Sequence, residues 1–215
     1  MIVDIQYWGL ESYRSWGFYY VRSNLVHPDT KSIIDYCSHL NNNSTTIVFT
    51  ATKNLFGINH AYLASYFASK AIFNRRNFAK DLGMELLLYL SRQNQINIAI
   101  DYYGISDKQK LREEMWAVVF FASSVEQLLA EKNSLESFLG TSLVTEPQTT
   151  LPTTASENFP KDLFINELYL ETMEKIALEI PNLPEMPSSS RERALLQTII
   201  EKMAILSLDK IKLLS

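Results

Sequence analysis

The segment 114–123, EMWAVVFFAS, constrains the fold of this chain more than any other. It is rich in β-branched and aromatic residues and is apolar on both of its faces, which is typical of a strand inside a sheet. Three segments of similar composition precede it, at 2–8, 17–23 and 45–51. We therefore expect a small sheet in which 114–123 is an interior strand.

Helical periodicity occupies the chain between the third and fourth strands and again after the fourth. The expected helices are 55–74, 77–91, 95–103, 123–139, 161–180 and 190 to about 209. Strands that alternate with several helices in this way are typical of a mixed fold. The sequence predicts an α/β (α+β) protein, with a small, mostly antiparallel sheet packed against several helices.

A dense polar cluster, SRQNQ at 91–95, separates two apolar helical runs. Asn, Gln and Ser side chains hydrogen-bond their own backbone and so tend to end or begin helices. We interpret the cluster as a joint. One helix should end near Arg92 and the next should begin near Asn94, with Asn94 and Gln95 as caps.

Residues 140–160 differ from the rest of the chain, because Thr, Ser and Pro dominate and no apolar period is visible. This composition predicts a flexible insertion in a single domain formed by 1–139 and 161–215.

The one cysteine, Cys37, excludes a disulfide framework and a Cys-based zinc site. The first residues lack the layout of a signal peptide, and no apolar run reaches the roughly 18 residues that span a membrane. We expect a soluble, cytoplasmic protein.

The net charge is −4, but it is unevenly distributed. Residues 36–80 contain no Asp or Glu and five Lys or Arg, so this stretch carries +5 and the remainder of the chain −9. A local anionic partner would explain the difference, since local charge governs attraction. Burial of most of the stretch would explain it equally well.

A basic turn, NRRNFAK at 74–80, lies inside the acid-free stretch. Arg and Lys supply charge for phosphate, and an aromatic ring nearby offers a surface on which a base can stack. This composition is typical of proteins that hold single-stranded RNA, although a solvated helix end would look the same. The candidate RNA-binding residues are Tyr66, Lys70, Asn74, Arg75, Arg76 and Lys80.

Two titratable residues lie on apolar helical faces, His60 and Glu85. Each is either a hydrogen-bonded core residue or part of a hydrolytic site, and the core interpretation is favoured because no nucleophile or second acid lies at a matching spacing. Lys80 or Arg92 could pair with Glu85. No phosphate-binding, zinc-protease or nucleophile-elbow motif is present, so we expect no catalytic residues, no metal, no cofactor and no small-molecule substrate.

The last expected helix is apolar on more than one side. Leu195, Ile199, Met203 and Leu206 form one stripe, while Ile205 and Leu208 fall on the opposite arc. A helix of this kind buries a second face against its own fold or against a partner.

The segment 60–107 resembles the central part of the small, kinase-binding subunits of the KEOPS complex. That family shows a His-Leu-x-x-Ala helix start, a polar and basic turn, and then the pattern A-x-x-L-x-x-E-x-L-L-Y-x-S-G-x-R-Q-I-x-x-A-I-x-x-x-G. The matching positions are His60, Ala64, Ala79, Leu82, Glu85, Leu87, Leu88, Tyr89, Ser91, Gln95, Ile96, Ala99, Ile100 and Gly104. The chain departs from the pattern at Arg92, where the family has Gly, and at Asn94, where it has Arg. Residues 199–210 resemble the family's final helix.

The resemblance implies a non-catalytic subunit that binds the small atypical kinase of the complex. It further implies contact with the single-stranded 3′ end of tRNA, for threonylcarbamoylation of the adenosine beside the anticodon. The kinase-binding residues it implies are Ile199, Met203, Ile205, Leu206 and Leu208. The alternative is a free-standing RNA-binding or regulatory adaptor outside such a complex.

Overall fold

The computed structural model describes residues 1–21, 29–40, 44–52, 55, 57–105, 116–145 and 198–206. The expected helix at 161–180, residues 146–160 of the expected insertion, the start of the last helix and Leu208 lie outside them.

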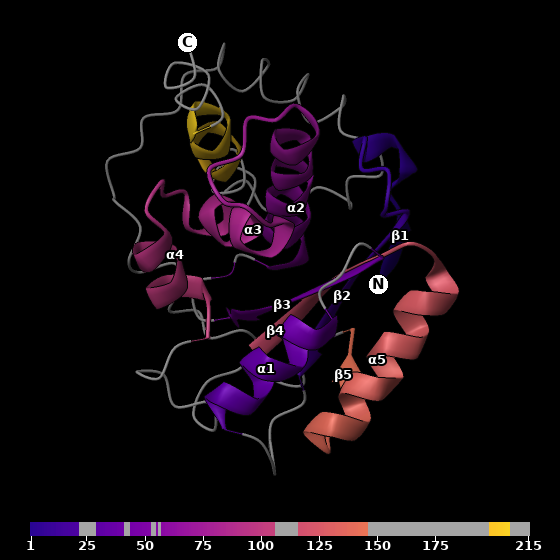
Figure 1. The fold of residues 1–215 in the computed structure, drawn as a ribbon. Coiled ribbons are helices and arrows are strands. Elements are labelled where there is room, and N and C mark those ends of the chain that lie inside the picture. Colours follow the sequence, from indigo (N-terminus) through magenta and orange to yellow (C-terminus); the bar gives the residue numbers. More distant parts are fainter. Residues whose placement is uncertain are drawn as a thin grey trace, which may run out of the picture.

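The sheet has five antiparallel strands around a buried central pair (Figure 1). The strand order is β1 (Ile2–Asp4), β2 (Ser15–Val21), β4 (Trp116–Ala122) and β3 (Thr45–Ala51), and β5 (Leu143–Val144) also pairs with β2. Every residue of β4 is 0–1% exposed. The prediction that this segment is an interior strand is therefore confirmed.

Alternating side chains of the strands supply two separate cores. In β2, Trp16 and Phe18 face one core, and Tyr19 and Val21 face the other. The first core is covered by α2 (Gly57–Phe73), α3 (Leu82–Ser91), α4 (Ile96–Tyr103) and a helix at 198–206. The second is covered by α1 (Thr30–Leu40) and α5 (Val125–Leu139) (Figure 1). The result is a sheet between two helical layers, which confirms the expected mixed α/β fold.

The segment 2–8 is only partly a strand. β1 ends at Asp4, whose carboxylate accepts hydrogen bonds from the backbone N–H and the side-chain amide of Gln6, both at 3.0 Å. This local bonding turns the chain into a 3₁₀ helix, η1 (Gln6–Trp8), because an Asp side chain competes with the strand ladder for backbone donors. Gly9 closes η1 with a φ of 91°, a conformation that favours glycine.

Two further elements were not expected from the sequence. Helix α1 buries Ile33 completely, and Tyr36, Cys37 and Leu40 pack against the same core while staying partly exposed. Strand β5 lies inside the range 140–160, where a flexible insertion was expected. Gly140 ends α5 with a φ of 63°, and the Glu136 carboxylate then accepts a 2.7 Å hydrogen bond from the backbone N–H of Leu143. This bond directs the chain back to the edge of β2.

The polar cluster at 91–95 is a joint between α3 and α4, as predicted. The backbone N–H of Arg92 donates to the Tyr89 carbonyl and that of Gln93 to the Leu88 carbonyl, each at 3.2 Å, which is a helix closure of the Schellman type. Arg92 has a left-handed φ of 57°. Gln95 occupies the position before α4, but its side chain makes no capping hydrogen bond, so that expected cap is wrong.

Candidate functional site: the basic turn after α2

Helix α2 ends in the same kind of closure as α3. The backbone N–H of Arg76 donates to the Ala71 carbonyl at 2.8 Å, and that of Arg75 donates to the Ile72 carbonyl at 3.0 Å. Arg75 takes the left-handed position, with a φ of 55°. The side chains of Asn74, Arg75 and Arg76 are all exposed at this corner. Positive charge there is favourable because unpaired helix carbonyls carry partial negative charge.

The rest of the turn is fixed by buried hydrogen bonds. Glu85 is fully buried, and its Oε2 accepts the backbone N–H groups of Phe78 at 2.9 Å and Ala79 at 2.8 Å. The side-chain amide of Asn77 donates to the Ala79 carbonyl at 2.7 Å. Asp81 begins α3 by accepting the backbone N–H of Met84. These bonds support the favoured interpretation of Glu85 as a structural anchor, but its bonds to the turn come from backbone amides rather than from Lys80.

Lys70 is held between α2 and η1. Its ammonium lies 5.5 Å from the ring centroid of Tyr66 and 5.9 Å from that of Phe73, and it donates to the backbone carbonyl of Tyr7 at 3.3 Å. A cation at this distance from aromatic rings is attracted to their faces. The structure therefore brings Lys70 and Tyr66 together, as the sequence suggested.

Two exposed aromatic residues at this place were missed by the sequence reasoning. Phe73 is 55% exposed although it is the last residue of α2, and Tyr7 is 69% exposed in η1. A Cβ atom at Gly9 would lie 2.8 Å from Cγ of Phe73, so only glycine allows the ring to lie this close to the η1 backbone. The sequence predicts a strand at Tyr7, because the pattern of apolar residues does not mark the turn at Asp4.

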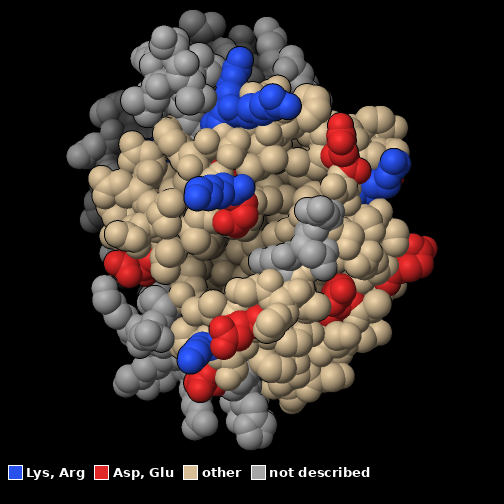
Figure 2. Space-filling view, in the orientation of Figure 1, with Lys and Arg blue, Asp and Glu red and all other residues tan. Residues whose placement is uncertain are grey.

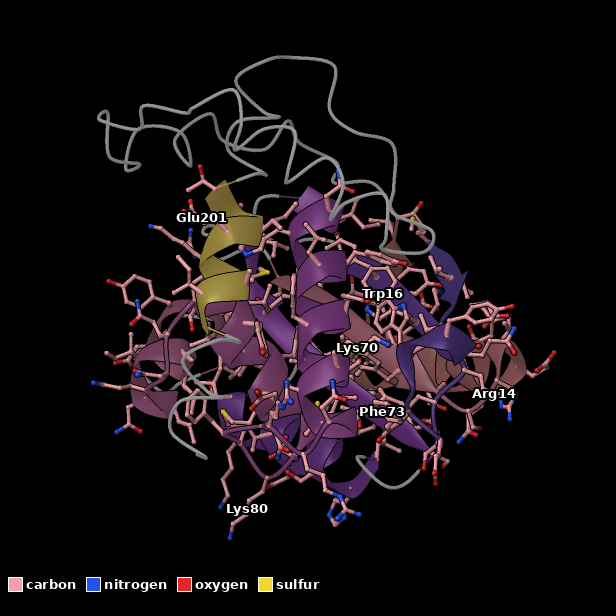
Figure 3. The ribbon with its side chains drawn as sticks, turned by 90° about the horizontal axis from the view of Figure 1, so that it is seen from above. Arg14, Trp16, Lys70, Phe73, Lys80 and Glu201 are labelled. Carbon is pink, nitrogen blue, oxygen red and sulfur yellow. The ribbon has the colours of Figure 1, made fainter. Side chains whose placement is uncertain are left out.

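Tyr66 and Lys80 fit the candidate site less well. Tyr66 is half-buried, and its ring makes edge contacts with Trp8 at 5.7 Å and Phe67 at 5.8 Å, so part of it belongs to the core. Lys80 is exposed, but in Figure 3 it points away from Lys70 and Phe73 at the rim of the molecule.

Within the described chain, the charges of Arg75, Arg76 and Lys80 have no ion-pair partner. Figure 2 shows basic side chains together at the upper end of the displayed face, where α2 and α3 lie, with no acidic side chain beside them. Other basic side chains on that face lie next to Asp or Glu. Unpaired, exposed cations attract anionic ligands more strongly than paired ones.

His60 is a core residue in α2. It is 1% exposed and its ring packs edge-on against Tyr103, with centroids 5.9 Å apart. Burial, and secondarily the charge of Arg92, lowers the pKa of His60 to about 3. Burial also raises the pKa of Tyr103 to about 12. His60 is therefore neutral near pH 7 and lies out of reach of solvent.

The helix at 198–206 places most of the expected kinase-binding residues in the chain's own core. Ile199 and Met203 are 0% exposed and Leu206 is 7% exposed. These side chains pack with α2, α3 and α4 residues, so they do not face a partner in this conformation. Ile205 is 47% exposed on the opposite arc, as its periodicity predicted.

No three His, Cys, Asp or Glu side chains in the described ranges converge as a metal site would require. No helix within those ranges combines the length and the apolar character needed to cross a bilayer.

The chain matches no protein-family model and no curated protein.

Proposed function

We propose that this protein is a non-catalytic, RNA-binding subunit that docks on the small atypical kinase of a KEOPS-like complex and holds the 3′ end of tRNA for threonylcarbamoylation. The observation that carries the RNA half is the corner after α2. There, exposed Arg75 and Arg76 have no ion-pair partner and adjoin a lysine held among aromatic rings. Cations beside exposed rings match the two demands of a single strand, phosphate neutralisation and base stacking.

The segment that resembles the kinase-binding subunits folds into one packed unit of α2, α3 and α4. Most of its matching positions are buried, among them Ala64, Leu88, Tyr89 and Ala99 at 0% exposure. Arg92, at the family's Gly position, has the left-handed backbone that glycine adopts most readily. These features support a shared framework, and the exposed corner after α2 is the part of this framework that can bind a ligand.

The kinase half of the proposal rests on the resemblance and on Ile205. An exposed isoleucine on a helix whose other apolar side chains are buried is a candidate partner contact. Leu208, the other expected position on this arc, lies outside the described residues.

The RNA half is tested by titrating the protein with intact tRNA and with tRNA that lacks its last three nucleotides, at two salt concentrations. We expect tighter binding of intact tRNA. Arg75→Ala and Arg76→Ala should each weaken binding and lower the salt slope by about 0.7 in log units, the value for one phosphate contact on a single strand. Arg14→Ala removes an exposed arginine that Figure 3 places away from this corner, and it serves as the matched control. Equal affinity for both tRNAs, or wild-type binding by the Arg75→Ala/Arg76→Ala protein, would contradict the proposal.

The second candidate, a free-standing RNA-binding adaptor, is favoured by the burial of Ile199, Met203 and Leu206. That burial removes most of the expected docking stripe from the surface. Purification of the tagged protein from its native source decides between the two, because only the first candidate retains an atypical kinase in stoichiometric amount. A hydrolase built on His60 and Glu85 gains no support, since both side chains are buried and Glu85 holds backbone amides.

A further inference from the structure

We propose that Phe73 is a preorganised base-stacking platform and that Lys70 binds the phosphate of the nucleotide stacked on it. This inference rests on the proposed RNA-binding function. It assigns the stacking role to Phe73 instead of Tyr66, and it names the ligand as an unpaired nucleotide of a single-stranded RNA.

The position of Phe73 is unusual for a phenylalanine. It is 55% exposed, so more than half of the side chain is in contact with water. The ring is nevertheless held in place, because one side of it lies against the backbone of Gly9, where even a Cβ atom would approach its carbons to 2.8–3.1 Å. The left-handed φ of 91° at Gly9 and this close contact both require glycine. A ring that is held on one side and is more than half exposed loses little conformational entropy when a planar base stacks on it.

Lys70 supplies the charge at the matching place. It precedes Phe73 by three residues, so both side chains leave α2 on the same face. Its ammonium is held 5.9 Å from the Phe73 ring centroid and bonds to the Tyr7 carbonyl, which leaves other N–H donors for a ligand. Figure 3 shows the two side chains near each other beside the 3₁₀ segment. Ring and ammonium together match a base joined to a phosphate.

The surrounding charge favours a nucleotide over an apolar peptide. Arg75 and Arg76 follow Phe73 directly, are exposed, and have no ion-pair partner in the described chain. Desolvating these cations against an apolar peptide would be unfavourable, whereas phosphates of the next nucleotides would neutralise them. Tyr7, 69% exposed and bonded through its carbonyl to Lys70, is the second exposed aromatic residue at this site.

The test uses the full-length protein and a short single-stranded RNA whose 3′-terminal base is 2-aminopurine, a fluorescent adenine analogue that is quenched when it stacks. Wild-type protein should quench the fluorescence on binding. Phe73→Ala and Phe73→Leu should remove the quench and weaken binding by about 5- to 150-fold, the range that loss of one stacked base produces. Phe73→Tyr keeps a ring and should retain the quench. Tyr102→Ala removes an aromatic side chain of equal exposure, 55%, from α4 and is the matched control.

An RNA with an abasic terminal residue provides a second arm, since it keeps the phosphate and loses the ring. Wild-type protein should bind it as weakly as Phe73→Leu binds the complete RNA. Unchanged quenching and affinity in Phe73→Leu would overturn the stacking proposal, even if tRNA binding still depends on the 3′ end. A quench that Tyr102→Ala removes equally would also overturn it. Failure of wild-type protein to bind any single strand would remove both this proposal and the RNA-binding function.

Discussion

Arg75 and Arg92 are the two described residues other than glycine with a left-handed backbone. Each closes a helix where glycine is the usual residue, because a Cβ atom makes this conformation costly by about 1 kcal/mol or more. Arg75 lies at the candidate site, so the cost is accepted where a guanidinium is exposed to solvent. Local strain of this kind tends to accumulate at functional positions.

Arg75→Gly should therefore weaken RNA binding without lowering the stability of the fold. Relief of the left-handed backbone outweighs the greater entropy of glycine in the unfolded chain, so the free energy of unfolding should stay unchanged or rise by up to about 1 kcal/mol. RNA affinity should fall with the loss of one phosphate contact. Urea denaturation measures the first effect. Arg76→Gly is the control, because Arg76 is also exposed but lacks the positive φ, and it should be destabilising by roughly 0.5 kcal/mol. A larger loss in Arg75→Gly than in Arg76→Gly would contradict this account.

His60 gives a prediction for pH. Its pKa is about 3 in the folded protein, against about 6.5 in an unfolded chain. Between these values the unfolded chain binds a proton that the folded chain excludes. The contribution of His60 to the free energy of unfolding is therefore fully present above pH 6.5 and is lost as the pH drops toward 3. The contribution lost between pH 6.5 and 4.5 is about 2 kcal/mol. Denaturant midpoints of wild-type and His60→Gln proteins across this range provide the measurement. Identical slopes in the two proteins would show that His60 is not the group responsible.

At the scale of elements, the sequence identified helices and strands whose apolar residues recur at a regular spacing. β3 was predicted with its observed bounds because its seven residues are all buried, and α2 because its small and aromatic residues repeat at helical spacing. η1 and β5 were missed because local hydrogen bonds decide them, from Gln6 to the Asp4 carboxylate and from the backbone N–H of Leu143 to the Glu136 carboxylate. The same limit applies to the candidate site. Its charges were visible in the sequence, but the position of the Phe73 ring depends on its contact with Gly9, 64 positions away.

The helix at 198–206 shows that periodicity identifies a stripe without saying which stripe the fold buries. Leu206→Glu places a charge in the core and should cost several kcal/mol or prevent folding, because Leu206 is 7% exposed. Ile205→Glu lies on the exposed arc and should change stability by no more than about 0.5 kcal/mol. If a kinase docks there, Ile205→Glu should also lose the complex. Thermal unfolding and calorimetry with the kinase measure the two effects. A folded Leu206→Glu protein of wild-type stability would show that this helix does not pack as described.

At the scale of the whole molecule, the basic turn and α5 lie in different helical layers. α2 and the basic turn lie on one side of the sheet, and α5, with Glu126 exposed in its first turn, lies on the other (Figure 1). The fold class was predictable because alternating buried strands and amphipathic helices allow few other arrangements. The placement of the basic turn and of α5 in different layers was not predictable, because charge totals along a sequence do not say which layer each residue joins.

Under the proposed function, this placement predicts how the chain would distinguish the end of tRNA from its body. Acidic residues of the α5 layer should repel phosphates that lie beyond the basic corner, so binding should be confined to the 3′ strand. Neutralising two of them in Glu126→Gln/Glu131→Gln should raise the affinity for tRNA that lacks its last three nucleotides by roughly two- to fivefold at low salt, with less change for intact tRNA. The ratio of the two affinities should therefore fall, and the difference from wild type should disappear at high salt because exposed charges are screened. The ratio is measured by filter binding at roughly 50 and 300 mM salt, which screen exposed charges weakly and strongly, respectively. An unchanged ratio at low salt would mean that the discrimination comes from base and phosphate contacts at the corner alone, and that the charge of the opposite layer has no part in it.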